Sequence, residues 1–274
     1  MDRKKSVVVV TFVWRDLRSM EKMALNCGLV RLARHPFAIV HPKRYSIDAL
    51  KQKYPQVIDM PMADEHFVSV DSYNEMMLTA DFYRQFQQYD FMLIYQLDAF
   101  VFRDELDEWV ARDYDYIGAP WLPSDSWWQR MVGEMVIRLR KILPSTHDYS
   151  KGRMRHAAKY FEVGNGGFSL RKVSTMLRVL TENRALIDSL PHGSGARQED
   201  IVFSVILGKK CGLKKPDWHS AVQFAFCDNP NRCFRITKGR LPFGCHAWDT
   251  CHWENFWRGK LWFDEELHGN MMPR

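Results

Sequence analysis

One carboxylate, Asp98, directly follows an apolar run over residues 89–97 and could do chemistry at the end of a strand. The run is rich in aromatic and branched residues, which is the composition of a buried strand. Ligands of an open α/β sheet bind in the crevice beyond the carboxyl ends of its strands. An acid there can hold Mg²⁺ or Mn²⁺, because these ions prefer hard oxygen ligands, and the ion can hold a diphosphate. The alternative interpretation is structural: Asp98 caps a helix that starts near Arg103, or closes a turn.

A second stretch with chemical potential is Gly164-Asn165-Gly166-Gly167-Phe168-Ser169-Leu170-Arg171. Its glycines allow a sharp turn and a close approach of the backbone to a ligand. The spacing is that of neither a Rossmann fingerprint nor a P-loop. After the glycines the pattern returns to a strand, and we expect Arg171 to begin a helix. A glycine-rich bulge that binds nothing is the plain alternative.

Two acids and one histidine complete the candidate set. Glu199 and Asp200 precede an apolar helix that begins at Ile201. An acid in the first turn stabilises a helix by about 0.3–1 kcal/mol, so capping alone would explain both. His246 follows Gly244 in a turn that would expose its ring, which favours a role as a ligand.

The elements that must position these residues follow from the hydrophobic pattern. It predicts strands at 7–13, 37–40, 66–70, 89–97, 114–121 and 168–170, and helices at 17–33, 46–53, 71–87, 104–111 and 201–207. The alternation of strands and helices indicates an α/β protein with a mostly parallel sheet. With no repeat and no linker, residues 1–274 are expected to form a single domain. Within it, 1–121 would be a nucleotide-binding half and 161–274 an acceptor-side half.

Residues 122–160 have no strand signal and form a helical insertion or lid in this scheme. Trp127, Trp128 and Met131 keep a helical spacing, with Arg138, Arg140 and Lys141 close by. The structural interpretation is an amphipathic helix that caps the core. The functional one is a lid, or an interfacial helix in contact with a membrane or a lipid-linked acceptor.

Composition narrows the class of partner. The net charge of +6 and the pI near 9.0 suit a nucleotide diphosphate, an anionic membrane or a polyanion. No helix-turn-helix, zinc-finger or RNP-like pattern supports nucleic acid. Lys4-Lys5 and the apolar run after them lack a small-residue cleavage site, and no run is long enough to span a bilayer. We therefore expect a cytoplasmic protein, with at most a peripheral contact at the inner face of the membrane.

The six cysteines do not form the pattern of a disulfide-dense exported scaffold, and reduced thiols are the expectation. A structural zinc site can be imagined from Cys227, Cys233, Cys245, Cys251, His246 and His252. Both cysteine pairs lack the short spacing of a zinc knuckle, which argues against that site.

The combination of motifs resembles a GT-A glycosyltransferase. More narrowly, it is similar to a bacterial family classed as a domain of unknown function, number 5672, whose members are regarded as glycosyltransferases. The resemblance runs from Val7 to about Trp257 without the 122–160 segment, and it rests on Tyr73-Asn74, 95–100, 116–121, 164–171 and 241–246. It implies a Rossmann-like mixed sheet, a nucleotide-sugar donor, such as a UDP-sugar, and a glycan or lipid-linked acceptor.

The resemblance also implies roles for individual residues. Asp98 matches the last acid of the metal-binding Asp-x-Asp motif, with Gln96 in place of the first acid, and His246 would complete a Mn²⁺ or Mg²⁺ site. The donor would contact Thr11, Phe12, Tyr73, Asn74, Gln96, Asp98, Asn165, Gly166 and Gly167. Asp200, or alternatively Glu199, would be the base that takes a proton from the acceptor hydroxyl of an inverting enzyme.

Two other classes compete with this interpretation. A sugar nucleotidyltransferase can share the sheet, but it usually has a glycine-rich, lysine-bearing loop after the first strand, and residues 13–17 contain no glycine. A catalytically inactive sugar-binding or interaction protein would suit Gln96 and the 14% of aromatic residues.

Overall fold

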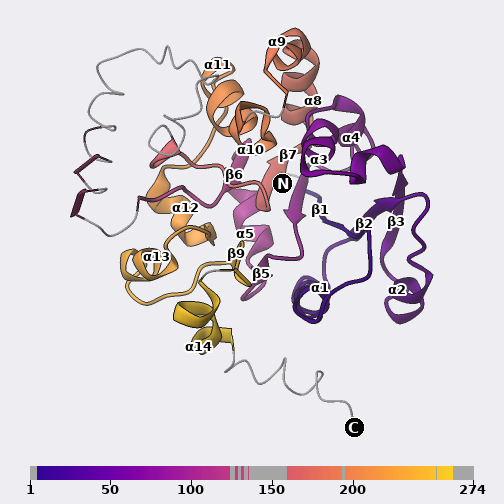
Figure 1. The fold of residues 1–274 in the computed structure, drawn as a ribbon, viewed down its shortest axis with the longest axis horizontal. Coiled ribbons are helices and arrows are strands. Elements are labelled where there is room, and N and C mark those ends of the chain that lie inside the picture. The colour runs from indigo at the N-terminus through magenta and orange to yellow at the C-terminus, as the bar shows by residue number, and fades with distance from the viewer. Residues whose placement is uncertain are drawn as a thin grey trace.

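The computed structural model describes residues 5–123, 127, 128, 131, 132, 135, 159–192, 195–250 and 252–261. In this part of the chain the main sheet has six strands in the order β3-β2-β1-β4-β7-β6 (Figure 1). They are β1 (Val7–Phe12), β2 (Phe37–Pro42), β3 (Ile58–Met62), β4 (Phe91–Tyr95), β6 (Tyr116–Gly118) and β7 (Phe168–Lys172). The pairings among β3, β2, β1 and β4 are parallel, whereas β7 runs antiparallel to both β4 and β6. The predicted mixed, mostly parallel α/β sheet is confirmed.

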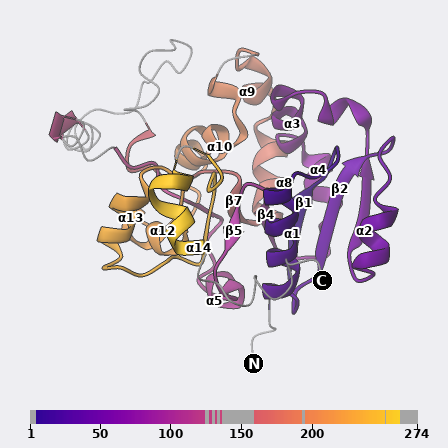
Figure 2. The same ribbon diagram turned by 60° about the horizontal axis from the view of Figure 1, so that its bottom comes forward.

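Helices cover both faces of this sheet (Figures 1 and 2). One face carries α1 (Ser19–Arg31), α5 (Leu106–Ala111) and α12 (Trp218–Phe224), and the other carries α3 (Val70–Met77), α4 (Ala80–Arg84) and α8 (Val173–Glu182). Successive residues of a strand point to opposite faces. Accordingly, Val7 and Val9 pack with the first set of helices, and Val8 and Val10 pack with the second. No helix in the described ranges is long and apolar enough to cross a membrane.

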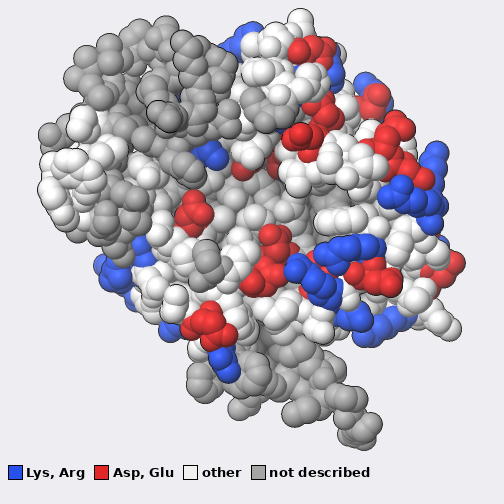
Figure 3. All heavy atoms as spheres, viewed as in Figure 1, with Lys and Arg blue, Asp and Glu red and all other residues white. Residues whose placement is uncertain are grey.

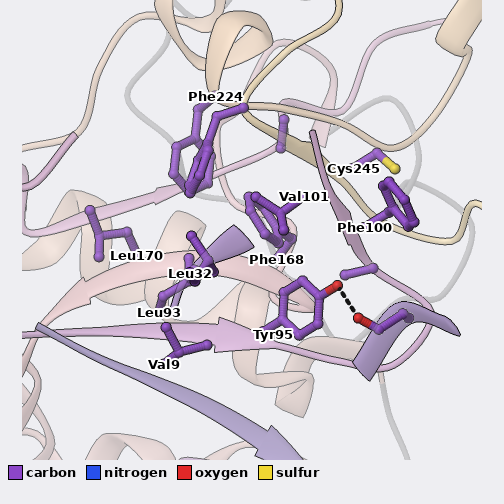
Figure 4. Packing of buried hydrophobic residues seen from close by; sticks show 14 of the residues in the cluster. Val9, Leu32, Leu93, Tyr95, Phe100, Val101, Phe168, Leu170, Phe224 and Cys245 are labelled. Atoms are coloured by element: carbon purple, nitrogen blue, oxygen red, sulfur yellow. Dashed lines mark hydrogen bonds between the residues drawn. The ribbon is translucent and has the colours of Figure 1, made fainter. Parts of the chain in front are cut away.

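A small second sheet joins the end of β4 to the last third of the chain. It consists of β5 (Phe100–Val101), β9 (Gly244–Cys245) and β8 (Ala225–Phe226), in that order. Aromatic side chains fill the space between the two sheets (Figure 4). The Tyr95 hydroxyl, on β4, donates a hydrogen bond of 2.7 Å to the Ala24 carbonyl of α1. Since Tyr95 is the last residue of β4, this bond fixes the strand end against α1.

The remaining described elements are short. They are α2 (Asp48–Lys53), η1 (Asp64–Phe67), α9 (Arg184–Ser189), η2 (Gly195–Arg197), α10 (Glu199–Ile201), the π-helix η3 (Val202–Leu207), α11 (Gly208–Lys210), α13 (Pro230–Ile236), the π-helix η4 (Trp253–Trp257) and α14 (Arg258–Leu261). Between β6 and β7, two backbone segments form a closed neck. The Trp121 amide donates to the Glu162 carbonyl and the Phe161 amide donates to the Trp121 carbonyl, next to a bridge between Pro120 and Val163.

The predicted strand at 66–70 is wrong. Residues 58–62 form the strand, and 64–67 form a turn of 3₁₀ helix. β3 is an edge strand, with one proline and alternately half-buried residues, so it lacks the branched, buried composition that betrays a central strand.

The helix predicted over 71–87 is divided into α3 and α4, because two side chains cap separate starts. Ser69, rather than Asp71, caps α3 by accepting from the Ser72 amide, and Thr79 caps α4 by accepting from the Phe82 amide.

Candidate active site

A cavity of about 720 Å³ lies beyond the carboxyl ends of β1 and β4. The predicted site residues that line it are Phe12, Tyr73, Asn74, Gln96, Asp98, Asn165, Gly166, Gly167, Glu199, Asp200 and His246. In the space-filling view the middle of this face is hollowed, with both acidic and basic side chains near its rim (Figure 3). The fold thus brings together residues up to 234 positions apart, from Phe12 to His246.

Thr11 is the predicted site residue that does not line this cavity. It is fully buried, and its hydroxyl has no hydrogen-bond partner within the described part of the chain. Alternation along β1 turns Thr11 toward the opposite face from Phe12. Phe12 contacts Tyr73 edge to face, with ring centroids 5.1 Å apart, and both rings line the cavity. Of the two strand-end residues, Phe12 is the one placed to contact a ligand.

His246 lies beside Asp98 because two short strands are paired. Phe100 of β5 pairs with Cys245 of β9, so the residues preceding β5 lie opposite those following β9. The His246 Nε2 atom is 3.2 Å from Asp98 Oδ1 and 3.3 Å from Gln96 Oε1. Its other ring nitrogen, Nδ1, is 3.6 Å from the Cys227 sulfur. Protein contacts to both ring nitrogens therefore fix the orientation of the imidazole.

Asp98 and His246 stabilise each other's charged forms. Burial alone would raise the pKa of Asp98, but the charge and the hydrogen bond of His246 outweigh burial and lower it. Burial would likewise lower the pKa of His246, and the charge and hydrogen bond of Asp98 outweigh it and raise it. The two shifts agree in describing an ion pair.

Gly166 and Gly167 separate this ion pair from the two acids. The backbone amide of Gln96 donates to the Gly167 carbonyl at 2.9 Å, which continues the pairing of β4 with β7. A Cβ atom on Gly167 would be 2.0 Å from His246 Nε2, and one on Gly166 would be 1.9 Å from Glu199 Oε1. Side chains are excluded at both positions, so the backbone itself forms the floor between the two groups.

Glu199 is held by the interior of the protein. Its carboxylate forms an ion pair of 2.8 Å with Arg171, and both side chains are almost wholly buried. Its amide donates to Asn74 Oδ1 at 2.9 Å, so α3 fixes the start of α10. These contacts favour a structural role for Glu199 over the alternative in which it is the base.

Asp200, the next residue, lies in surroundings that would suit a general base. It lines the cavity, and the hydrogen bond that its Oδ1 accepts within the described ranges is the local one from the Ile201 amide, at 2.7 Å. Burial, and then the negative charge of Glu199, raise the pKa of Asp200 to about 6. A carboxylate with a pKa near the working pH combines the deprotonated state with useful basicity.

Four charged residues of the cavity were missed in the sequence. Glu21 binds Arg15 through 2.6 and 3.0 Å contacts and binds Arg18 at 2.9 Å, and Arg18 also reaches Asp249 at 3.5 Å. Burial raises the pKa of Glu21, but the hydrogen bonds from Arg15 and Arg18 outweigh it and lower the pKa to about 2. The available signal was the position of Arg15 and Arg18, directly after a strand that ends at the crevice.

The donor set of Asp98, His246 and Gln96 fits a divalent cation in part, with the cation displacing the proton of His246, because only a neutral imidazole nitrogen is a ligand. Two ligands in adjacent octahedral positions at bond lengths of about 2.1 Å are separated by about 3.0 Å. The spacings of 3.2 and 3.3 Å around His246 Nε2 are close to that value. Within the described ranges no group of three or more His, Cys, Asp or Glu side chains could hold a metal ion. The protein would therefore leave several ligand positions to substrate oxygens or water.

Solved structures with a similar arrangement of elements include glycosyltransferases. Mouse xyloside xylosyltransferase 1 in its apo form is 11% identical with a TM-score of 0.53, over 90% of this chain and 98% of that chain. The galactosyltransferase LgtC, solved with donor and acceptor sugar analogues, is 12% identical with a TM-score of 0.53, over 97% of this chain and 98% of that chain. At these identities the likeness shows the fold alone, which is GT-A-like.

Comparison with known sequences identifies a family but no curated relative. No curated protein matches this sequence. Residues 57–246, which are more than half of the chain, match a family described as "Protein of unknown function (DUF5672)". The matched range contains α3, the end of β4, the glycine turn (residues 164–167), the paired acids Glu199 and Asp200, and His246. The chain therefore belongs to the DUF5672 family.

Proposed function

We propose that this protein is a glycosyltransferase that moves a hexose or N-acetylhexosamine from a nucleotide sugar, such as a UDP-sugar, to a glycan or lipid-linked acceptor. The observation that carries the proposal is the arrangement around Gly166 and Gly167. Asp200 lines the same cavity as the Asp98–His246 pair, on the other side of these two glycines. A transferase needs both a site for the leaving diphosphate and a base for the acceptor.

The donor would extend from the end of β1 to the glycine turn. Phe12 and Tyr73 offer aromatic surface to the nucleoside, and Asn74, Gln96 and Asn165 offer polar groups to the sugar. Gln96 Nε2 already donates to the Tyr73 hydroxyl at 2.9 Å, and Asn165 Oδ1 accepts from the Gly167 amide at 3.3 Å. These bonds limit the rotamers of both amides, so the polar groups are oriented before a ligand binds.

Negative charge would grow on the diphosphate as the bond to the sugar breaks. A bound Mn²⁺ or Mg²⁺, held by Asp98 and His246 with Gln96 nearby, would supply positive charge at the leaving oxygens. Arg18 lines the same part of the cavity and is 61% exposed, so it is also available to the diphosphate.

On the opposite side, Asp200 would take the proton from the acceptor hydroxyl. The hydroxyl oxygen then forms the new bond to the anomeric carbon while the bond to the diphosphate oxygen breaks. Attack from the face opposite the leaving group inverts the anomeric configuration. In a bacterial cell such a reaction fits cell-surface polysaccharide biosynthesis from cytoplasmic nucleotide sugars.

Release of nucleoside diphosphate from a panel of sugar nucleotides tests the proposed activity. We expect release from one donor class, stimulated by Mn²⁺ or Mg²⁺ and by an acceptor. An inactive sugar-binding protein would release none while still giving a thermal shift with the donor; a ligand at about 100 times its Kd stabilises by about 2.7 kcal/mol. A nucleotidyltransferase would instead release pyrophosphate from a nucleoside triphosphate and a sugar phosphate.

We further propose that residues 126–143 contact an anionic membrane or the lipid of an acceptor. Trp127 and Trp128 are 67% and 62% exposed, and their ring centroids are 5.1 Å apart. The basic positions of this hypothesis, Arg138, Arg140 and Lys141, lie outside the described residues. We expect salt-sensitive sedimentation with anionic vesicles, and its loss when both tryptophans are changed to alanine. Neutral vesicles are the control, and equal binding to both kinds would refute an electrostatic contact.

A further inference from the structure

Arg171 has no atom on the cavity surface, yet it lies directly beneath the site. It belongs to β7 and is fully buried. Its Nε donates to Ser169 Oγ at 3.0 Å, and Nη1 donates to the Tyr83 hydroxyl at 2.7 Å. Nη2 donates to the Gly166 carbonyl at 3.3 Å and lies 2.8 Å from Glu199 Oε2. Every nitrogen of the guanidinium is thus engaged.

Aromatic rings enclose the guanidinium. Its central carbon is 5.3 Å from the ring centroids of both Tyr116 and Phe203, which come from β6 and from the π-helix η3. A fully buried ion pair costs desolvation energy that its own attraction repays only with excellent geometry and further hydrogen bonds. Hydrophobic residues packed here would often give at least the same stability. The desolvation cost of the ion pair therefore indicates a role beyond packing.

The two groups that Nη2 contacts belong to different parts of the site. The Gly166 carbonyl belongs to the glycine turn, and the Glu199 carboxylate belongs to the start of α10. Arg171 contacts both through Nη2 while its other two nitrogens donate elsewhere, and a lysine ammonium cannot reproduce this planar set of contacts. Asp200 follows Glu199 directly, and its Cβ is 3.2 Å from where a Cβ on Gly166 would lie.

A second anchor holds the chain just before Glu199. Arg197 pairs with the Glu75 carboxylate, and its Nη1 donates to the Ile187 carbonyl at 2.7 Å. This anchor fixes the backbone of residue 197 but does not touch the glycine turn. The Arg171 guanidinium, by contrast, contacts both the turn and the acid-bearing helix, which also pack directly against each other at Gly166.

We propose that Arg171 is a positioning residue, which ties the Gly166 carbonyl to Glu199 and thereby sets the place and the electrostatic surroundings of Asp200 in the transfer reaction. The inference rests on the proposed function of Asp200 as the base. Arg171 acts from beneath the floor of the cavity and contacts neither donor nor acceptor. Glu199 is the intermediary: its negative charge lies beside Asp200, and Arg171 balances that charge.

Several charged and titratable groups face Asp200 from the surrounding elements. They are Glu199 and Arg171, Lys159 from the neck, Tyr116 on β6, and Cys227 and His246 from the second sheet. Glu199 raises the pKa of Asp200, whereas Lys159 and Arg171 lower it. Changes at Glu199 and at Arg171 should therefore move the titration of Asp200 in opposite directions.

The test compares Arg171→Lys, Arg171→Met and Glu199→Gln in the full-length protein, with Arg178→Lys as the matched control. Arg178 lies on α8, is half exposed, and pairs with Glu182 at 3.2 Å on the surface. For Arg171→Lys, which keeps the positive charge but not the planar guanidinium, we expect a fall in kcat of about tenfold or more with an unchanged KM for the donor. The neutral variant Arg171→Met should in addition displace the acid limb of the pH–rate profile to higher pH, because the charge that lowers the pKa of Asp200 is lost. For Glu199→Gln the acid limb should move to lower pH. Arg178→Lys should behave like the unchanged protein.

A purely structural ion pair would alter stability without moving the acid limb, and that result would overturn the inference. If the Arg171 variants do not fold, Tyr83→Phe removes one hydrogen bond of the guanidinium and should lower kcat by less, with an unchanged KM for the donor. Urea unfolding from pH 5 to pH 8, with and without Asp200→Asn, follows the proton of Asp200 independently of turnover. Suppose that the Arg171 and Glu199 variants shift the pH dependence of unfolding in opposite directions, but Asp200→Asn does not change turnover. Asp200 is then not the base, while the inferred effect of Arg171 on Asp200 stands. An absence of shifts in both measurements would sink the inference about Arg171.

Discussion

Changing Asp200 to asparagine is expected to lower turnover about 10²–10⁴-fold, the usual loss when a general base is removed. Asparagine keeps the shape of the side chain and an oxygen that can accept from the Ile201 amide, but it has no basicity. Donor binding should be unchanged. In the unchanged enzyme kcat/KM should rise with pH through about 6, where Asp200 loses its proton, and this limb should be absent from the residual activity of the variant.

Stability gives an independent check, with a defined sign. The pKa of Asp200 is raised to about 6 from the ordinary value of 3.8, so the folded protein favours the protonated form. Its contribution to stability is present below pH 3.8 and is lost as the pH rises through about 6. The Asp200→Asn variant lacks this loss. Its melting temperature relative to the unchanged protein should therefore rise between pH 4 and pH 7 and then level off.

Glu199→Gln is the comparison that separates the two acids. If Glu199 were the base, its change would abolish turnover and that of Asp200 would not. Losing a helix cap costs about 1 kcal/mol of stability and leaves turnover alone. Near-normal turnover of Asp200→Asn, or a product that retains the anomeric configuration of the donor, would be incompatible with Asp200 as the base of an inverting transfer.

The second large effect is expected at Asp98. Asp98→Asn should weaken metal-stimulated binding of UDP by at least 10–100-fold, the loss that even outer partners of metal ligands typically cause. The neutral amide keeps the shape of the side chain but loses the negative charge that attracts a cation. Isothermal titration of UDP with Mn²⁺, and again with chelator, measures the effect. The fold should persist, because Asp98 lies at the cavity surface with a side chain 33% exposed.

Asp249→Asn is the matched control for Asp98. Asp249 lines the same cavity, but its carboxylate pairs with Arg18 at 3.5 Å. It should leave metal-stimulated binding largely intact. If the unchanged protein binds UDP equally well with chelator and with Mn²⁺, the cation has no part in donor binding, and Asp98 and His246 need another role.

The sheet and most of the cavity were predictable because local composition determines them. Buried runs such as 7–10 and 91–95 are strands, and the residues that follow central parallel strands meet at one edge. Asp98 was therefore found from its position alone. Phe12 and Thr11 were predicted together from the resemblance to GT-A enzymes, which did not distinguish which of the two neighbours lines the cavity.

Other parts depend on contacts that leave little trace in sequence. The approach of His246 to Asp98 depends on β5 and β9, which have two residues each and so no periodicity to detect. Arg171 was expected to begin a helix, since a charged residue is unusual inside a buried strand. Its partners on β6, α4, η3 and α10 are all distant in sequence, and only Ser169 and Gly166 are close to it along the chain.

The closed neck between β6 and β7 has a consequence for the stability of this fold. Backbone hydrogen bonds between Trp121, Phe161 and Glu162 hold the chain before residue 123 close to the chain after residue 159. Loop-closure entropy grows only slowly with length, so inserted residues change stability little once the ends are fixed. A change in the number of residues between 123 and 159 is therefore expected to alter the stability of the described part of the chain only slightly.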